Sequence, residues 1–401
     1  MNSIPRPPLD PEQLRPESRL IHSGILRSQF GENAEALFLT QGFVYDEAEM
    51  AEARFSNKAP GFVYSRYGNP TIAMFEDRLA ALEGAEACRG TASGMAAVTA
   101  SLLCFLKAGD HVVAARALFG SCRWVIEDFL PRFGVPCTLV DGTNLAEWKA
   151  AVRPETAAFF LESPTNPTLD VLDIAEIAKI AKSAKAKLIV DNVFATPLLQ
   201  SPLKLGADIV VYSATKHIDG QGRCLGGAVL SSQQFIMDHM HNFLRQTGPS
   251  LSPFNAWVLL KGMETLGVRI ERMQQNATKL ADILAGNSKV KKVLYPGRAD
   301  HPQAALVKRQ MKGGGTLIAL EVEGGKPGAF RFCNALRLIR VSNNLGDTKS
   351  LIVHPATTTH QRFTPEARAE MGIGDGLLRL SVGLEHVDDL AEDLERGFRA
   401  N

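Results

Sequence analysis

The chain has 401 residues, of which 45% are hydrophobic and 22% are charged. This length suits two globular domains, and this composition excludes a mostly disordered protein. The 44 Lys and Arg residues nearly balance the 43 Asp and Glu residues, so the formal net charge is +1. Such a balance argues against a nucleic-acid-binding protein that works by neutralising phosphates.

The sequence also argues against a membrane protein, a secreted protein and a metalloprotein. No uninterrupted apolar run approaches the roughly 18 residues that a membrane helix needs. The first residues are rich in proline and charge and lack the apolar core of a signal peptide, so we expect a cytoplasmic protein. The six cysteines form no C-x-x-C pair, and His239 and His241 would face different sides of a helix. We therefore expect reduced thiols and no metal site.

Residues 1–59 contain clusters of Pro, Glu and Ser and show little regular periodicity. We predict an extended N-terminal arm here, which lies over a neighbour rather than folding alone. The pattern changes afterwards, because residues 71–82 place apolar side chains at helical spacing. This predicted helix begins just after Pro70 and ends at Gly84.

Short apolar runs alternate with helical stretches across residues 60–265. An amphipathic helix is predicted from about Asp173 to Lys185, and another helix is predicted over residues 98–106. Continuous apolar strands between such helices indicate a mostly parallel sheet that is covered on both faces. This large domain is predicted to be α/β, with strands at 111–115, 156–161, 187–190, 208–212 and 226–230.

Residues 266–401 show fewer and less regular elements, which predicts a smaller α+β C-terminal domain. A long helical stretch leads into this domain over residues 256–285, and a break is expected near Gly262. The other predicted elements are strands at 316–322 and 377–382 and helices at 328–336 and 387–398.

Two predicted strands end in reactive side chains, at the edge where ligands bind in such sheets. The fourth strand leads to Lys216, which is either an ordinary surface lysine or a Schiff-base lysine that needs a lowered pKa. The third strand leads to Asp191, which is either a helix cap or the partner of a protonated pyridine nitrogen. One strand–helix–strand unit separates the two residues, so adjacent strands could present both side chains to one ring.

The segment Thr91–Ala97 offers a different kind of site. Its small residues precede a helix, and the first backbone N–H groups of that helix would be free to bind an anion. No Gly-Lys-Ser/Thr follows and no G-x-G-x-x-G is present, so neither a Walker loop nor a dinucleotide site is indicated. An ordinary helix start remains the alternative for this segment alone.

Taken in order, these and other fragments resemble the cystathionine γ-synthase-like family of pyridoxal-phosphate (PLP) enzymes, which has fold type I. The resemblance covers nearly the whole chain, from about His22 to the terminal helix. Each fragment alone is a weak signal, whereas the ordered series is specific. The fragments are YSRYGNPT (64–71), ASGMAA (92–97), ESPTNP (162–167), VDN (190–192), SATK (213–216) and LSVGLE (380–385).

The resemblance implies pyridoxal 5'-phosphate as the cofactor and a role for each matching residue. Lys216 would carry the cofactor, and Asp191 would pair with its ring nitrogen. Tyr64 and Arg66 would reach the phosphate of a neighbouring subunit, which implies a homo-oligomer with shared active sites, usually a homotetramer in this family. The other implied cofactor contacts are Ser93, Gly94, Met95, Phe119, Ser213 and Thr215, and the implied substrate contacts are Asn166, Asn344 and Arg379.

Three variants resemble one branch of the family, the O-succinylhomoserine sulfhydrylases. Phe119 stands where most members have tyrosine, Asn344 stands where serine is common, and Asp219–Arg223 replaces the common loop after the lysine. This branch implies a γ-replacement that converts O-succinyl-L-homoserine and sulfide into L-homocysteine and succinate, a step of methionine biosynthesis. A cystathionine γ-synthase that uses cysteine and an O-acetylhomoserine sulfhydrylase remain alternatives. Ser121 stands where methionine γ-lyases usually have cysteine, which counts against that activity and leaves a γ-lyase as the third alternative.

The acyl group is not fixed by the sequence, because no second arginine has an assigned place and Arg223 is only a guess. Cys122 lies close in sequence to Phe119, and we interpret it as a structural thiol. A non-catalytic binding protein needs no Schiff-base lysine, and a nicotinamide dehydrogenase would need the missing glycine fingerprint. Both classes are therefore disfavoured.

Overall fold

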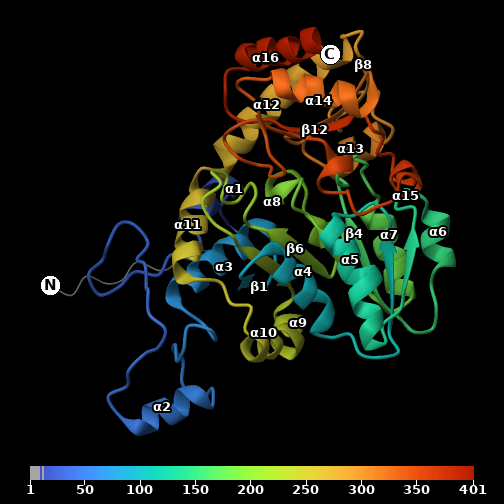
Figure 1. The fold of residues 1–401 in the computed structure, drawn as a ribbon. Coiled ribbons are helices and arrows are strands. Elements are labelled where there is room, and N and C mark those ends of the chain that lie inside the picture. The colour runs from blue at the N-terminus through green and yellow to red at the C-terminus, as the bar shows by residue number, and fades with distance from the viewer. Residues whose placement is uncertain (1–9, 11–12) are drawn as a thin grey trace.

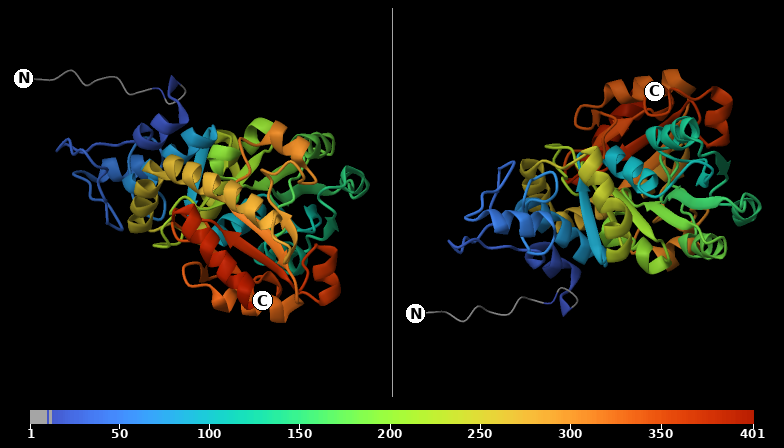
Figure 2. Two further views of the ribbon diagram at one scale, coloured as in Figure 1. Left: turned by 90° about the horizontal axis from the view of Figure 1, so that it is seen from above. Right: turned by 90° about the horizontal axis from the view of Figure 1, so that it is seen from below.

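The computed structural model describes residue 10 and residues 13–401, which form two sheets surrounded by helices and an arm that projects to one side (Figure 1, Figure 2). The C-terminal helix lies on the outside of the smaller sheet, far from the arm. Across the described residues, no helix combines the length and the apolar character that a bilayer crossing needs.

The larger sheet contains β1 (Ala87–Thr91), β2 (His111–Ala115), β3 (Cys137–Val140), β4 (Thr156–Glu162), β5 (Lys187–Asp191), β6 (Ile209–Ser213) and β7 (Gly227–Ser231). Their order is β1-β7-β6-β5-β4-β2-β3. The strands from β6 to β3 run parallel, whereas β7 is antiparallel to β1 and to β6. The predicted mostly parallel sheet is confirmed, with one reversed strand.

Helices cover both faces of this sheet (Figure 1). The helix predicted over residues 71–82 is confirmed: the Asn69 side chain accepts from the Thr71 N–H at its start, and Gly84 ends it in a left-handed conformation. The helices of this region are α3 (Pro70–Glu83), α4 (Gly94–Leu103), α5 (Gly120–Trp124), α6 (Leu145–Ala150), α7 (Ile174–Ser183), α8 (Thr196–Leu199), α9 (Gln233–Phe235), α10 (His241–Thr247) and α11 (Pro253–Glu264).

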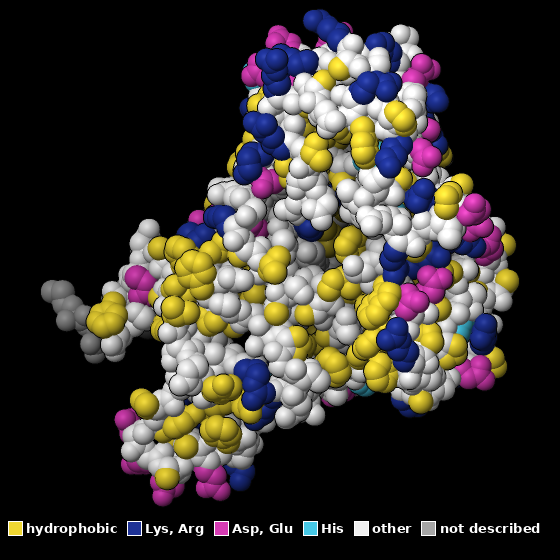
Figure 3. All heavy atoms as spheres, viewed as in Figure 1, with side chains coloured by type: hydrophobic (Ala, Val, Ile, Leu, Met, Phe, Trp, Pro, Cys, Tyr) yellow, Lys and Arg dark blue, Asp and Glu magenta, His cyan; other side chains and the backbone are white. Residues whose placement is uncertain are grey.

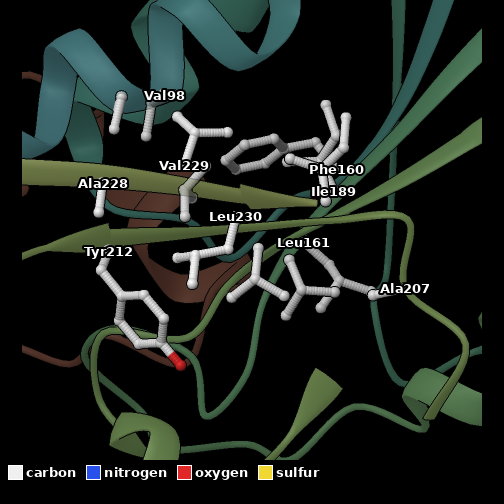
Figure 4. Close-up of a cluster of buried hydrophobic side chains, with 14 of the residues drawn as sticks. Val98, Phe160, Leu161, Ile189, Ala207, Tyr212, Ala228, Val229 and Leu230 are labelled. Atoms are coloured by element: carbon white, nitrogen blue, oxygen red, sulfur yellow. The ribbon is translucent and has the colours of Figure 1, made fainter. Parts of the chain in front are cut away.

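The core of the larger sheet is built from the apolar runs that predict its strands. Figure 4 shows Val98 of α4 packed over Val229 of β7, while Leu230 and Tyr212 lie on the opposite face. Successive side chains of a strand point to opposite faces, so a strand that is covered on both sides needs an unbroken apolar run. These buried side chains hold the strand ends, and therefore the candidate site, in fixed positions.

The smaller sheet contains β8 (Val290–Leu294), β9 (Leu317–Val322), β10 (Arg340–Val341), β11 (Leu351–Val353) and β12 (Leu377–Ser381), in the order β10-β11-β12-β9-β8. Its helices are α12 (Leu266–Ala285), α13 (Ala304–Gln310), α14 (Gly325–Ala335), α15 (Pro365–Glu370) and α16 (Val387–Ala400). Apolar side chains of α12, α14 and α16 pack against the sheet in one core. This is the predicted α+β arrangement.

The N-terminal arm departs from the prediction, because it contains α1 (Pro16–His22) and α2 (Ala48–Phe55) rather than extended chain alone. Most of the prediction for residues 1–12 lies outside the described residues. A buried ion pair ties the arm to the body: Arg78 of α3 donates to Glu35, and Arg78 Nε donates to the Ser23 carbonyl over 3.0 Å. Helix α1 packs against α3 and α11 with Leu20 buried, whereas the segment that contains α2 projects away from both sheets (Figure 1).

Two other details differ from the sequence-based expectations. The long helical stretch breaks at Thr265, between α11 and α12, three residues beyond Gly262. The sequence does not predict strands β1, β3, β8, β10 and β11. The division at residues 59 and 265 into an arm and two domains stays a prediction.

Candidate active site

A cavity of about 220 Å³ lies where the carboxyl ends of the large-sheet strands face the small domain. The large domain supplies most of its wall, and the small domain adds Asn343, Leu345 and Arg379. Most of the cofactor and substrate contacts implied by the resemblance line this cavity. They are Ser93, Gly94, Met95, Phe119, Asn166, Asp191, Ser213, Thr215, Lys216 and Arg379.

Lys216 follows β6 in a tight turn and points into the cavity. Its Nζ donates to the Asn344 Oδ1 over 2.6 Å. Burial, and to a smaller extent the nearby charge of Arg379, lower the pKa of Lys216 to about 8. A lysine with this pKa supplies a neutral amine near physiological pH, which nucleophilic and proton-transfer chemistry both require.

Asp191 ends β5, the strand next to β6, so the adjacency expected for Asp191 and Lys216 is present. The side chain is buried, and its Oδ1 accepts a hydrogen bond from the Val193 N–H over 3.1 Å. Burial raises the pKa of the Asp191 carboxyl to about 7. A cationic partner in the cavity would stabilise the carboxylate and reverse that shift.

The start of α4 forms one end of the cavity. The Ser93 hydroxyl accepts from the Ala96 N–H, while the first N–H groups of the helix have no partner within the helix. A Cβ on Gly94 would lie 2.5 Å from the Ser213 Cβ, so only glycine lets the helix approach the end of β6 this closely. The Thr215 hydroxyl lies beside them and donates to the Gly226 carbonyl over 3.2 Å. Backbone N–H groups and hydroxyls of this kind bind phosphate.

Arg379 lies in the cavity on β12 and is almost fully buried. Its Nη1 donates to the Asn166 Oδ1 over 2.9 Å, and its Nη2 donates to the Asn343 carbonyl over 3.0 Å. Its Nε has no hydrogen-bond partner among the described residues. Burial lowers the pKa of Arg379 to about 10, so the guanidinium stays charged and can bind a carboxylate.

Glu162 also lines the cavity, although no pattern in the sequence indicates a role for it. Its Oε2 accepts from the Phe119 backbone N–H over 2.8 Å, which fixes the position of the Phe119 ring in the wall. Burial, and then the charge of Asp191, raise the pKa of Glu162 well above its usual range. Two buried carboxyls this close favour one proton between them, and this signal exists only in the folded chain.

Four other residues from the sequence analysis lie elsewhere or serve differently. Tyr64 and Arg66 do not line the cavity of their own chain; the guanidinium of Arg66 lies over the Tyr64 and Tyr67 rings. Arg223 forms an ion pair of 2.8 Å with the buried Asp219, outside the cavity lining. Cys122 is buried in the cavity wall, where burial raises the pKa of its thiol.

The sequence profile of the family described as Cys/Met metabolism PLP-dependent enzyme matches residues 17–399. The chain belongs to this family. An O-succinylhomoserine sulfhydrylase of Mycobacterium tuberculosis is 50% identical over 401 residues, with 99% of each chain covered. An L-methionine gamma-lyase of Fusobacterium nucleatum is 42% identical over 380 residues, which are 94% of this chain and 96% of that relative.

A solved structure from Campylobacter jejuni, described as an O-acetylhomoserine (thiol)-lyase, superposes with a TM-score of 0.93 at 32% identity. It covers 96% of this chain and 100% of that chain, and it contains N'-pyridoxyl-lysine-5'-monophosphate. Fold type I, pyridoxal phosphate as the cofactor and an enzyme that acts on small amino-acid substrates are therefore confirmed. The relatives carry different activities, so they do not decide the reaction.

The cavity fits this cofactor on its own features. A protonated pyridine nitrogen would supply the cation that the buried Asp191 carboxyl lacks, and the start of α4 with Ser213 offers donors to a phosphate. Lys216 lines the same cavity as Asp191 and the start of α4. When bound, pyridoxal phosphate supplies an electron sink for charge that develops on an amino-acid substrate. Among the described residues, no three His, Cys, Asp or Glu side chains gather as a metal site would require.

Proposed function

We propose that the protein is an O-succinylhomoserine sulfhydrylase, which makes L-homocysteine and succinate from O-succinyl-L-homoserine and sulfide. The observation that carries this proposal is the 50% identity, over 99% of both chains, to the Mycobacterium tuberculosis relative of that name. The cavity supports it, because Lys216, Asp191 and Arg379 converge there from three different strands or strand ends. The product would serve methionine biosynthesis in the cytoplasm.

In this proposal each side chain has a defined task. Lys216 carries the cofactor, Asp191 pairs with its ring nitrogen, and Ser93, Gly94, Met95, Ser213 and Thr215 surround its phosphate. Phe119 stacks on the ring. Arg379 binds the substrate α-carboxylate, with Asn166 holding the guanidinium in place over 2.9 Å.

Proton transfer is assigned to Lys216. Its neutral amine takes the proton from Cα of the substrate and must give that proton up, to a position that the bound cofactor would supply, before it takes one from Cβ. Succinate then leaves from Cγ. Sulfide adds at Cγ, and Lys216 returns protons to Cβ and Cα, so the balance is one ester and one sulfide to one homocysteine and one succinate. Asn344 accepts a hydrogen bond from Lys216 Nζ over 2.6 Å and so aims the amine between these two carbon atoms.

The Lys216→Ala variant tests this assignment. We expect it to lose the visible absorption of the bound cofactor and at least roughly a hundredfold in kcat, because both the attachment point and the proton acceptor are removed. Absorption spectra and homocysteine release measure the two effects. Asn344→Ser is the matched control, and it should keep the absorption band. Near-normal turnover in Lys216→Ala would contradict the assignment.

The reaction itself is tested by offering the wild-type protein O-succinyl- and O-acetylhomoserine, each with sulfide or with cysteine. The proposal expects the highest kcat/KM for the succinyl ester with sulfide. Preference for cysteine would instead indicate a cystathionine γ-synthase. Release of methanethiol from methionine at a higher kcat/KM would indicate a γ-lyase, as in the Fusobacterium nucleatum relative.

We also propose that the protein is a homo-oligomer with shared active sites, and a homotetramer in particular. Apolar side chains on the arm are strongly exposed in the single chain, and they include Val44 at 94% and Leu39 at 68%. Figure 3 shows such side chains gathered on the projecting segment that contains α2. Exposed apolar patches of this kind mark interaction surfaces. Tyr64 and Arg66 follow this segment and would then reach the phosphate of a neighbouring subunit.

A further inference from the structure

A second cavity, of about 430 Å³, adjoins the candidate active site. The two cavities share Phe119 and Asn343 in their walls. Phe119 lines the candidate active site, and the Asn343 carbonyl accepts from Arg379, to which we assign the substrate α-carboxylate. A substrate whose α-carboxylate binds Arg379 can therefore extend its other end past Asn343 into the second cavity.

Arg362 is the cationic residue among the described residues that line this second cavity. Its Nη2 donates to the Gly120 carbonyl over 2.5 Å, and its guanidinium lies 4.7 Å from the centre of the Phe363 ring. A Cβ on Gly120 would lie 2.8 Å from the Thr359 carbonyl, so the loop that carries Arg362 packs directly on the residue after Phe119. These contacts hold the guanidinium at the cavity rather than in solvent.

The ion pair between Arg362 and its acidic partner, Asp128, is weak. Nη1 of Arg362 lies 3.5 Å from the Asp128 Oδ2, and the two side chains are 34% and 47% exposed. An ion pair of that length and exposure contributes little. A carboxylate that enters the cavity can therefore displace Asp128 and gain the short, forked geometry that arginine offers.

We propose that this second cavity is the subsite for the acyl group at Cγ of the substrate, and that Arg362 binds the terminal carboxylate of a succinyl ester. This inference rests on the proposed function and extends it to the choice of ester. An acetyl ester ends in a methyl group and offers Arg362 nothing to bind. Arg223 is not suited to this role, because Asp219 neutralises it outside the cavity.

The Arg362→Met variant tests the inference directly. We expect kcat/KM for O-succinylhomoserine with sulfide to fall roughly 10- to 100-fold, the value of a hydrogen bond to a charged group. The value for O-acetylhomoserine should change by less than about threefold, because that ester makes no such bond. Equal losses with both esters, or no loss with either, would overturn the inference, as would a wild-type preference for the acetyl ester.

Two further variants separate recognition from a structural role. Asp128→Asn removes the ion pair but leaves Arg362, so kcat/KM for the succinyl ester should be kept or increased. If Arg362 merely held the fold through Asp128, both variants would lose activity alike. Arg396→Met is the control, because Arg396 on α16 is also half-exposed and lies 3.3 Å from an aspartate, Asp393. It should leave the ratio of kcat/KM for the two esters unchanged. Arg362→Lys keeps the positive charge but loses the two-pronged hydrogen-bonding geometry of the guanidinium. Its kcat/KM for the succinyl ester should lie between those of the wild type and Arg362→Met. This variant tests the inference if Arg362→Met fails to fold.

Binding of succinate to the holoenzyme supplies a readout that does not depend on turnover. Calorimetry should show succinate binding to the wild type and at least roughly tenfold weaker binding to Arg362→Met. If the wild type turns over neither ester, the proposed function fails. The succinate titration still shows in that case whether Arg362 binds a carboxylate in the second cavity. Equal succinate affinity in the two proteins overturns the subsite even if the proposed function holds.

Discussion

At the scale of single residues, a buried carboxyl outside the cavity, Glu83, is connected through Tyr212 to the residue next to Asp191. The Tyr212 hydroxyl donates to Glu83 Oε2 over 2.5 Å, and Asn192, next to Asp191, donates to the Tyr212 oxygen over 2.6 Å. Glu83 Oε1 has no partner among the described residues. Burial raises the pKa of Glu83 to about 8, so this carboxyl is protonated in the folded chain at neutral pH.

This carboxyl makes stability depend on pH in a known direction. Between about pH 4.5, its ordinary pKa, and about pH 8, the folded chain binds a proton that the unfolded chain has released. The contribution of Glu83 to the free energy of unfolding is therefore complete below about pH 4.5 and is lost as the pH rises to about 8. The Glu83→Gln variant keeps the acceptor for Tyr212 and cannot titrate.

We expect the thermal midpoint of Glu83→Gln to fall less than that of the wild type as the pH rises from about 5 to about 8. Thermal unfolding of both proteins, in parallel and with the cofactor bound, measures the difference. Parallel curves for the two proteins would mean that Glu83 is already ionised in the folded state, contrary to its buried position.

At the scale of elements, α12 of the small domain holds the turn that contains Lys216 through hydrogen bonds. Arg269 Nη1 donates to the His217 carbonyl over 2.7 Å, and its Nη2 donates to the Gly262 carbonyl over 2.8 Å. The turn ends at Gly220, whose φ of +68° is left-handed and whose added Cβ would lie 2.0 Å from Arg269 Nη1. The position of the Lys216 amine, which we propose to be catalytic, is therefore set partly by a helix of the other domain.

Gly220→Ala should displace Arg269 and loosen this turn, so both the thermal midpoint and kcat should fall. Gly109→Ala is the matched control, since Gly109 is also left-handed, at φ +94°, and has nothing within 4 Å of an added Cβ. We expect the control to lose roughly 1 kcal/mol of stability and no activity. An equal effect of both substitutions would show that backbone strain alone, and not the clash with Arg269, is responsible.

Within the larger sheet, the sequence predicts the strands that are apolar along most of their length. Strands β2, β4, β5, β6 and β7 are unbroken apolar runs, and each was located to within a few residues. Strand β1 contains Arg89 and Gly90 and β3 has only four residues, and both lie at the edges of the sheet, where the apolar signal is weak.

The candidate site divides in a similar way. Strand order alone brings Asp191 and Lys216 to adjacent positions, which the sequence could indicate. Glu162 and Arg362 act through contacts with residues 119 and 120, far away in the chain. No local pattern contains those contacts, so the roles of both side chains emerge only from the folded structure.

At the scale of the whole molecule, the arm is anchored at its base and exposed beyond it. Arg78 is fully buried beside Glu35, and Lys261 of α11 adds a bond of 3.1 Å to the same carboxylate. A buried charge that loses its partner is strongly destabilising, so this cluster fixes where the arm leaves the body. The exposed apolar residues beyond that point are then presented in a defined direction.

Leu39→Glu tests whether another subunit covers this surface. We expect the wild type to be larger than one 43.5 kDa chain, and the variant to be smaller than the wild type and less active, because a buried unpaired charge is costly. Light scattering coupled to size exclusion measures the mass. Val341→Glu, at a similar exposure of 62% on β10 of the small domain, is the control. A wild type that is a single chain would contradict the proposed assembly.

The pairing of β1 with β7 has a consequence for the way this protein is made. A ribosome releases β1 early, yet its neighbour in the sheet, β7, is synthesised only after β2 through β6. Contacts between segments so distant along the chain form slowly, and an unpaired strand edge invites aggregation until they do. The nascent chain therefore keeps an open edge until residues 92–226 have been translated, so we expect its yield in a cell to depend on chaperones that shield that edge.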